Sequence, residues 1–241
     1  MINLETKKTR YCSRFALLHK SSFYPHYKFG ETLGKKQSWR NVGQHCLVAG
    51  IFAEILADAL RVPSSDKNII VEAAIIHDWY KKHEAIAQDG LRKQNKLTLQ
   101  DLDDIKEMDK KALEDFGMHS EVIYLSGANV PESEAGPQTL SQKIIWYVDA
   151  MLSNTEPMPI KERFKNLERG WDGTKEDCLR ASRNNLFSEL FRPKYNGKSI
   201  YELQIELADI IGEEFAKIMN YEGASDDLPL YLKKIFIGRI L

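Results

Sequence analysis

The sequence predicts an all-α fold, with a helical core over about residues 38–155 and a helical C-terminal extension over about 156–241. Apolar residues recur at steps of three and four, as they do on the buried face of an amphipathic helix. No segment of any length alternates apolar and polar residues as a half-buried strand does. The 241 residues, 43% of them hydrophobic and 29% charged, are typical of a globular protein, and we expect one domain over 1–241.

The predicted helices are separated by loops that contain proline, glycine or polar residues. Pro63 ends the helix over 42–60, and Ser65 or Asp66 is expected to cap the next one. Gly117 is expected to cap the C-terminal end of a charged helix. The helices are predicted over 11–20, 42–60, 67–84, 99–116, 119–126, 140–153 and 198–219, and basic, aromatic segments over 160–170 and 175–191 belong to the helical extension.

Composition excludes several classes of protein. Lys and Arg number 34 and Asp and Glu 35, so a net charge of −1 argues against a protein that coats duplex nucleic acid. No apolar run approaches the roughly 18 residues of a membrane helix, and the polar N-terminus has no apolar stretch of a secretory signal. The three cysteines are too widely spaced to predict a disulfide framework or zinc finger. We therefore expect a cytoplasmic protein that does not associate with membranes, and a homodimer is left open.

Four side chains able to bind a metal interrupt apolar helix faces. His45 lies one turn before Val48, the pair His77-Asp78 closes an apolar cluster, and Asp149 lies within the run IIWYVDAML. An unpaired buried carboxylate costs several kcal/mol, so Asp149 needs a partner. Helices joined by a short loop pack antiparallel, which would bring His45 close to His77. A divalent cation bound by two imidazoles and two carboxylates would account for all of these positions.

Each of these residues taken singly also fits a structural role. A histidine on an apolar face is often a hydrogen-bonded core residue, and an aspartate in an apolar helix is often a hydrogen-bond acceptor. The order and spacing of the four residues together favour the metal site.

The order His…His-Asp…Asp resembles the HD-domain metal-dependent phosphohydrolases. The resemblance covers about residues 38–155 and rests on the segments WRNVGQHCLVAGIFAEILADAL, VEAAIIHDWYKKHE and LSQKIIWYVDAML. It implies an all-α fold, hydrolysis of a phosphoester that is often a nucleotide, and Lys81 as part of a His-Asp-x-x-Lys motif. The metal ligands that it implies are His45, His77, Asp78 and Asp149.

Two departures from the family pattern bear on the site. Members with two metals carry additional histidines before the last aspartate, where this chain offers only His83 and His119, so we expect one ion. Gln44 stands where an acidic residue usually precedes the first histidine. Two imidazoles and two carboxylates suit Mn, Fe, Co, Ni or Zn, and Mg less well.

Other residues are candidates for catalysis and for substrate binding. Lys81 lies four residues after His77, on the same side of a helix, where its ammonium could hold a phosphate oxygen. Glu84 and His119 are candidates to move a proton or orient water, and Arg40 is a candidate phosphate contact. Lys81 equally fits a solvated basic helix end, His119 a partly exposed helix start, and Arg40 a contact with solvent.

The first functional hypothesis is a phosphohydrolase whose substrate is a small phosphorylated molecule such as a nucleotide. The second is an HD-fold sensor module that binds a nucleotide without turnover, and the third is oxygen chemistry at a di-iron centre. The C-terminal extension, with arginines among aromatic residues, fits a substrate lid or a packed helix pair; these residues are Arg163, Arg169, Arg180, Arg183, Arg192, Phe164, Trp171, Phe187 and Phe191.

Overall fold

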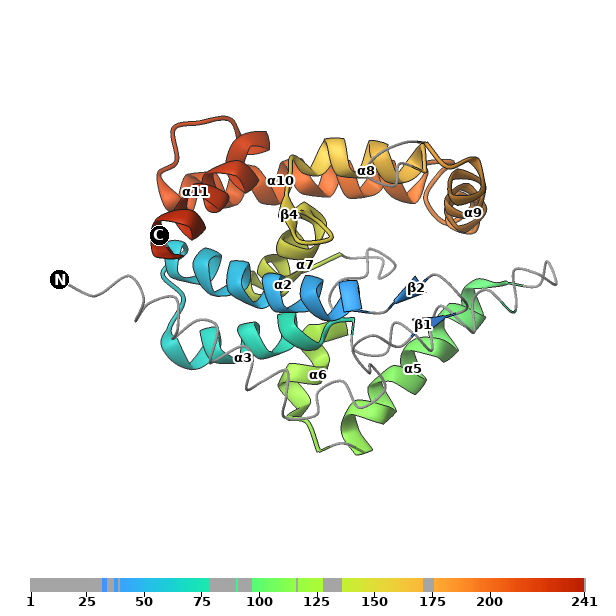
Figure 1. The fold of residues 1–241 in the computed structure, drawn as a ribbon, viewed down its shortest axis with the longest axis horizontal. Coiled ribbons are helices and arrows are strands. Elements are labelled where there is room, and N and C mark those ends of the chain that lie inside the picture. The colour runs from blue at the N-terminus through green and yellow to red at the C-terminus, as the bar shows by residue number, and fades with distance from the viewer. Residues whose placement is uncertain are drawn as a thin grey trace.

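The computed structural model describes residues 32–33, 37–38, 40–78, 90, 97–115, 117–127, 136–170 and 176–240. Within these ranges the chain is helical apart from two short pairs of strands, which confirms the all-α prediction (Figure 1). The main helices are α2 Arg40–Ala59, α3 Ser64–Ile76, α5 Leu99–Asp115, α6 Ser120–Ser126, α7 Leu140–Met151, α8 Ile160–Glu168, α9 Cys178–Glu189, α10 Ile200–Met219 and α11 Leu228–Ile240.

The strand pairs are antiparallel hairpins of two residues on each side. β1 (Thr32–Leu33) pairs with β2 (Gln37–Ser38), and β3 (Leu152–Ser153) pairs with β4 (Glu156–Pro157). The second hairpin follows α7 directly, so it lies next to the helix that carries Asp149.

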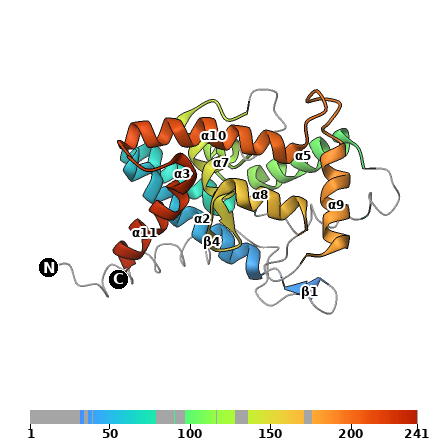
Figure 2. The same ribbon diagram turned by 90° about the horizontal axis from the view of Figure 1, so that it is seen from above.

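Helices α2, α3 and α7 form the centre of the molecule. α2 and α3 lie side by side, α7 packs against both, and α6 packs against α3 (Figure 1). α8 and α10 pack together, and α10 contacts α7 while α11 contacts α2, so the extension covers the other side of the centre (Figure 2). One contiguous core of buried apolar side chains runs from α2 to α11.

The central helices form where the sequence places apolar residues on faces that other helices cover. In α2, Ala49, Phe52 and Leu56 are buried at steps of three and four, and His45 precedes them on the same face. α7 is buried nearly all round, and a reciprocal capping box between Thr139 and Gln142 starts it. The histidine of α2 and the aspartate of α7 are therefore carried by two of the most enclosed helices.

Some predicted helix boundaries differ from the structure. Arg61 adopts a left-handed conformation (φ 59°) that reverses the chain after α2, so Pro63 becomes the N-cap of α3. The prediction that Ser65 or Asp66 caps α3 is wrong, because both lie within its first turn. Gly117 follows α5 with φ 82°, as expected of a C-terminal glycine. The helix predicted over 11–20 lies outside the described residues.

α3 and α7 end before the predicted positions. The Nδ1–H of His77 donates to the carbonyl of Ala74 (2.7 Å), which is the acceptor that Asp78 would use if α3 continued. That side-chain bond favours a helix end at this point, and residues 79–84 lie outside the described part of the chain. α7 ends at Met151 because the next residues turn into the β3–β4 hairpin.

Specific contacts join the C-terminal extension to the central helices. Asp58 of α2 pairs with Lys67 of α3 (2.7 Å) and with Arg239 of α11 (2.9 Å). The rings of Tyr147 in α7 and Phe215 in α10 pack edge to face at 5.3 Å.

Among the described helices, none is both long enough and apolar enough to cross a membrane.

Candidate metal centre

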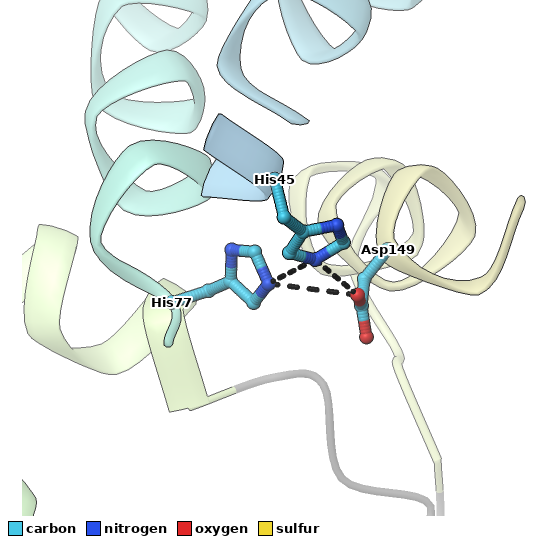
Figure 3. A group of neighbouring side chains, drawn as sticks. All are labelled: His45, His77 and Asp149. Carbon is cyan, nitrogen blue, oxygen red and sulfur yellow. Dashed lines mark hydrogen bonds and ion pairs between the residues drawn. The ribbon is translucent and has the colours of Figure 1, made fainter. Parts of the chain in front are cut away.

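Three side chains from three different helices converge at one point. His45 comes from α2, His77 from the turn that ends α3, and Asp149 from the last turns of α7 (Figure 3). The Nε2 of His45 lies 3.2 Å from the Nε2 of His77 and 3.0 Å from Oδ1 of Asp149. The third side of the triangle, from His77 Nε2 to Asp149 Oδ1, is 3.5 Å. The side chain of His77 is only 2% exposed, whereas that of Asp149 is 28% exposed, so the group is reached from one side.

The outer nitrogen of each ring is bonded to a backbone carbonyl. The Nδ1–H of His45 donates to the carbonyl of Asn154 (2.6 Å), and the Nδ1–H of His77 donates to the carbonyl of Ala74 (2.7 Å). Because a carbonyl only accepts, the proton of each neutral ring is on Nδ1 and its Nε2 presents a lone pair. Bonds of this kind orient the histidine ligands of metal ions.

Two lone pairs and a carboxylate oxygen therefore face one another. If His77 takes up a second proton on Nε2, that proton can bond to His45 or to Asp149. The 3.0 Å contact between His45 Nε2 and Asp149 Oδ1 then still joins two acceptors, with no hydrogen between them. A divalent cation would satisfy all three atoms at once. Within the described part of the chain, these are the residues whose donor atoms lie close enough together to hold a metal ion.

The electrostatics of the group also favour positive charge at its centre. Burial lowers the pKa of His77, but the carboxylates of Asp78 and Asp149 outweigh burial and raise it from 6.5 to about 9. Burial would raise the pKa of Asp149, but its contacts with His45 and His77 and the charge of Arg163 hold it well below its usual range. The centre thus keeps its carboxylate ionised and attracts a cation.

The spacing of the three atoms fits a coordination sphere. With bonds of about 2.1 Å, neighbouring ligands at tetrahedral or octahedral angles lie about 3.0–3.4 Å apart. The observed edges of 3.2, 3.0 and 3.5 Å are close to that range. Two imidazoles and a carboxylate suit Zn, Mn, Fe, Co and Ni and suit Mg less, and the identity of the ion stays a prediction.

Asp78, the fourth predicted ligand, lies beside this triangle. Its Oδ2 is 3.9 Å from the Nε2 of His77, and it is 21% exposed. Its charge raises the pKa of His77. Asp78 is not one of the three residues whose donor atoms converge, and its role as a ligand stays a prediction.

The other predicted site residues are not brought into the centre by the described structure. Lys81 and Glu84 lie outside the described residues, as do the side chains of Arg40 and Gln44; Arg40 is the first residue of α2. His119 is exposed and is the N-cap of α6, where its Nδ1 accepts from the backbone N–H of Glu121 (3.3 Å). Their roles stay predictions.

Two residues near the centre had no clear sequence signal. Arg163 is half-buried in α8, and its Nη1 donates to the carbonyl of Ala150, next to Asp149 (3.3 Å). The sequence identified Arg163 only as one of several arginines in the extension and did not predict which part of the molecule it contacts. Asn154 contributes through its backbone carbonyl, and the only hint was the turn-forming composition of Ser153-Asn154-Thr155.

Metal affinity should rise with pH below about 9. In this range His77 carries a proton that an ion must displace, because its folded pKa is about 9. We expect the affinity for Co²⁺ to increase about tenfold for each pH unit between about pH 7 and 8.5, with about one proton released per ion. Calorimetric titration in buffers of different ionisation enthalpy measures this proton. A pH-independent affinity would contradict metal binding to His77.

Comparison of the chain with protein-family models, with curated proteins and with solved structures gives no match.

Proposed function

We propose that this chain is a metal-dependent phosphohydrolase of the HD type, which hydrolyses a nucleotide or a related small phosphoester. The observation that carries the proposal is the convergence of His45 Nε2, His77 Nε2 and Asp149 Oδ1, with both Nδ1 atoms bonded to backbone carbonyls. The order His45, His77-Asp78, Asp149 along an all-α chain supports the HD assignment.

The residues of the centre have different proposed roles. His45, His77 and Asp149 would hold one divalent ion, and Asp78 is the predicted fourth ligand. When bound, such an ion polarises a phosphoryl group and lowers the pKa of water. Because Asp149 is partly exposed while His77 is enclosed, substrate would approach from the side of Asp149. Lys81, Glu84 and His119 remain the predicted groups for phosphate binding and proton transfer.

Arg163 supports an anionic substrate. It is a half-buried cation whose charge acts on Asp149. Within the described residues its guanidinium donates to the carbonyl of Ala150 (3.3 Å) and lies over the ring of Phe164, 5.3 Å from the ring centroid. A guanidinium has five N–H donors in a planar fork that suits phosphate oxygens. Among the described residues, one acceptor, the carbonyl of Ala150, takes a hydrogen bond from this fork. Arg163 is therefore our candidate for the phosphate contact on the extension.

Arg163→Met is expected to weaken phosphate binding by about tenfold to a hundredfold, as loss of a charge-assisted hydrogen bond does. The measurement is calorimetric titration of inorganic phosphate into metal-loaded protein, with metal content checked in parallel. Arg169→Met is the matched control, since Arg169 lies just after the same helix, is 58% exposed and bonds to Asn166. Equal phosphate affinity in wild type and Arg163→Met would remove Arg163 from the substrate site.

The experiment that tests the function is a turnover screen. Protein stripped of metal is reloaded with Mn²⁺, Co²⁺, Ni²⁺ or Zn²⁺ and offered phosphomonoesters, phosphodiesters and nucleotides. We expect metal-dependent release of phosphate or nucleoside, lost in Asp149→Asn. Nucleotide binding without turnover of any substrate would favour the sensor module. Oxygen consumption by protein that holds two iron ions per chain, in the absence of hydrolysis, would favour oxygen chemistry at a di-iron centre.

A further inference from the structure

The β3–β4 hairpin presents one backbone carbonyl to the metal centre. Ser153 pairs with Glu156, so Asn154 and Thr155 form a two-residue turn between the strands. Asn154 adopts a left-handed conformation, with φ 57°. Its carbonyl accepts the Nδ1–H of His45 at 2.6 Å, although the two residues are 109 positions apart. The bond therefore joins the start of the chain's helical core to the turn that follows α7.

We propose that Asn154 is a positioning residue, whose left-handed backbone aims its carbonyl at His45 and so holds the ring with Nε2 towards the metal. The direction of a carbonyl depends on the backbone angles on either side of it, and asparagine tolerates the left-handed region far better than most residues. The bond keeps the proton of His45 on Nδ1, so that the lone pair of Nε2 faces His77 and Asp149. The inference rests on the metal site of the proposed function but does not depend on which reaction that site performs.

The hairpin is held firmly enough to act as a support. Leu152 and Pro157, which pair across the hairpin, are both buried. The N–H of Met158 donates to the carbonyl of Met151 (2.9 Å), which closes the base of the hairpin. At its outer side, Lys233 of α11 pairs with Glu156 (2.7 Å). The hairpin thus contacts both α11 of the C-terminal extension and His45 of the metal centre.

Asn154 is well suited to a substitution test because its own side chain is exposed. Asn154→Gly keeps the left-handed conformation available, and Asn154→Val disfavours it, because a β-branched residue at positive φ is strained. Neither change removes a buried contact. The matched control is Asn220→Val, since Asn220 is also exposed and has φ 53°, but it caps the C-terminal end of α10.

Two readouts separate positioning from general stability. Affinity for Co²⁺ is measured by competition with a chelator, and the tautomer of His45 is read from nitrogen–hydrogen correlation spectra of the imidazole in metal-free protein. We expect Asn154→Val to lower the affinity by about tenfold to a hundredfold, as loss of an outer-shell partner does, and to mix the tautomers of His45. Asn154→Gly should stay near wild type in both readouts. Asn220→Val should lose thermal stability and keep its cobalt affinity.

The proposal would be overturned by wild-type cobalt affinity and a single Nδ1–H tautomer in Asn154→Val. It would also be overturned if Asn220→Val lost as much cobalt affinity as Asn154→Val, because the effect would then follow stability alone. If wild-type protein bound no cobalt, the proposed function would fail, and the tautomer of His45 in the two Asn154 variants would still decide whether the turn positions the ring.

Discussion

His77→Ala and Asp149→Asn should each abolish stoichiometric binding of a divalent ion at micromolar protein. His77→Ala removes one of the three donor atoms that lie within 3.5 Å of one another, and Asp149→Asn replaces the charged carboxylate by a neutral amide, which is a much weaker ligand for a divalent ion. Loss of an outer-shell partner alone costs about tenfold to a hundredfold in affinity, so loss of a ligand should cost at least about a hundredfold. The measurement is metal content per chain after dialysis, together with cobalt titration.

His119→Ala is the control for this experiment. His119 is exposed and caps α6, so its loss should leave the metal content unchanged. Circular dichroism of every variant shows whether the fold is kept, because a misfolded variant would lose metal for a trivial reason. Full metal content in folded His77→Ala or in folded Asp149→Asn would contradict the assignment of that residue as a ligand.

Gly170→Ala should lower the free energy of unfolding more than Gly197→Ala does. Gly170 follows α8 with φ 73°, and a Cβ there would collide with the backbone of Asp177 and Ala181 at the start of α9. Backbone atoms cannot move aside as the end of a flexible side chain can. Strain at positive φ and the collision together should cost about 2–4 kcal/mol in the free energy of unfolding.

Gly197→Ala separates the two contributions. Gly197 has φ 85°, but nothing lies within 4 Å of the position of its Cβ, so only the backbone strain of about 1 kcal/mol applies. Urea unfolding of both variants and of the wild type measures the difference. Equal losses in the two variants would show that α8 and α9 do not approach as closely as the structure describes.

The sequence predicted the helices where apolar periodicity and loop chemistry agree. α5 begins at Leu99 as predicted, and the left-handed Gly117 follows it. The N-cap of α3 was wrongly predicted at Ser65 or Asp66, because a left-handed Arg61 has no residue-type signal, unlike glycine or asparagine. The end of α3 depends on a side-chain bond from His77 to Ala74, which spacing alone does not reveal. The predicted helix boundaries were thus wrong where the actual boundary depends on one local hydrogen bond or one backbone angle.

The candidate site was predictable only where side-chain type carries the information. His45, His77 and Asp149 stand out because polar groups interrupt apolar helix faces, and the structure brings their donor atoms together. Asn154 acts through a backbone carbonyl, which every residue has, so its sequence identity indicates only a turn. The direction of Arg163 towards Ala150 depends on how α8 packs after the hairpin, which is a tertiary property.

The most direct test of the metal centre is anomalous diffraction from crystals of the cobalt-loaded protein at the cobalt edge. We expect one strong peak about 2.0–2.3 Å from Nε2 of His45, Nε2 of His77 and a carboxylate oxygen of Asp149. Crystals that contain cobalt but show no anomalous peak among these three atoms would contradict the central claim.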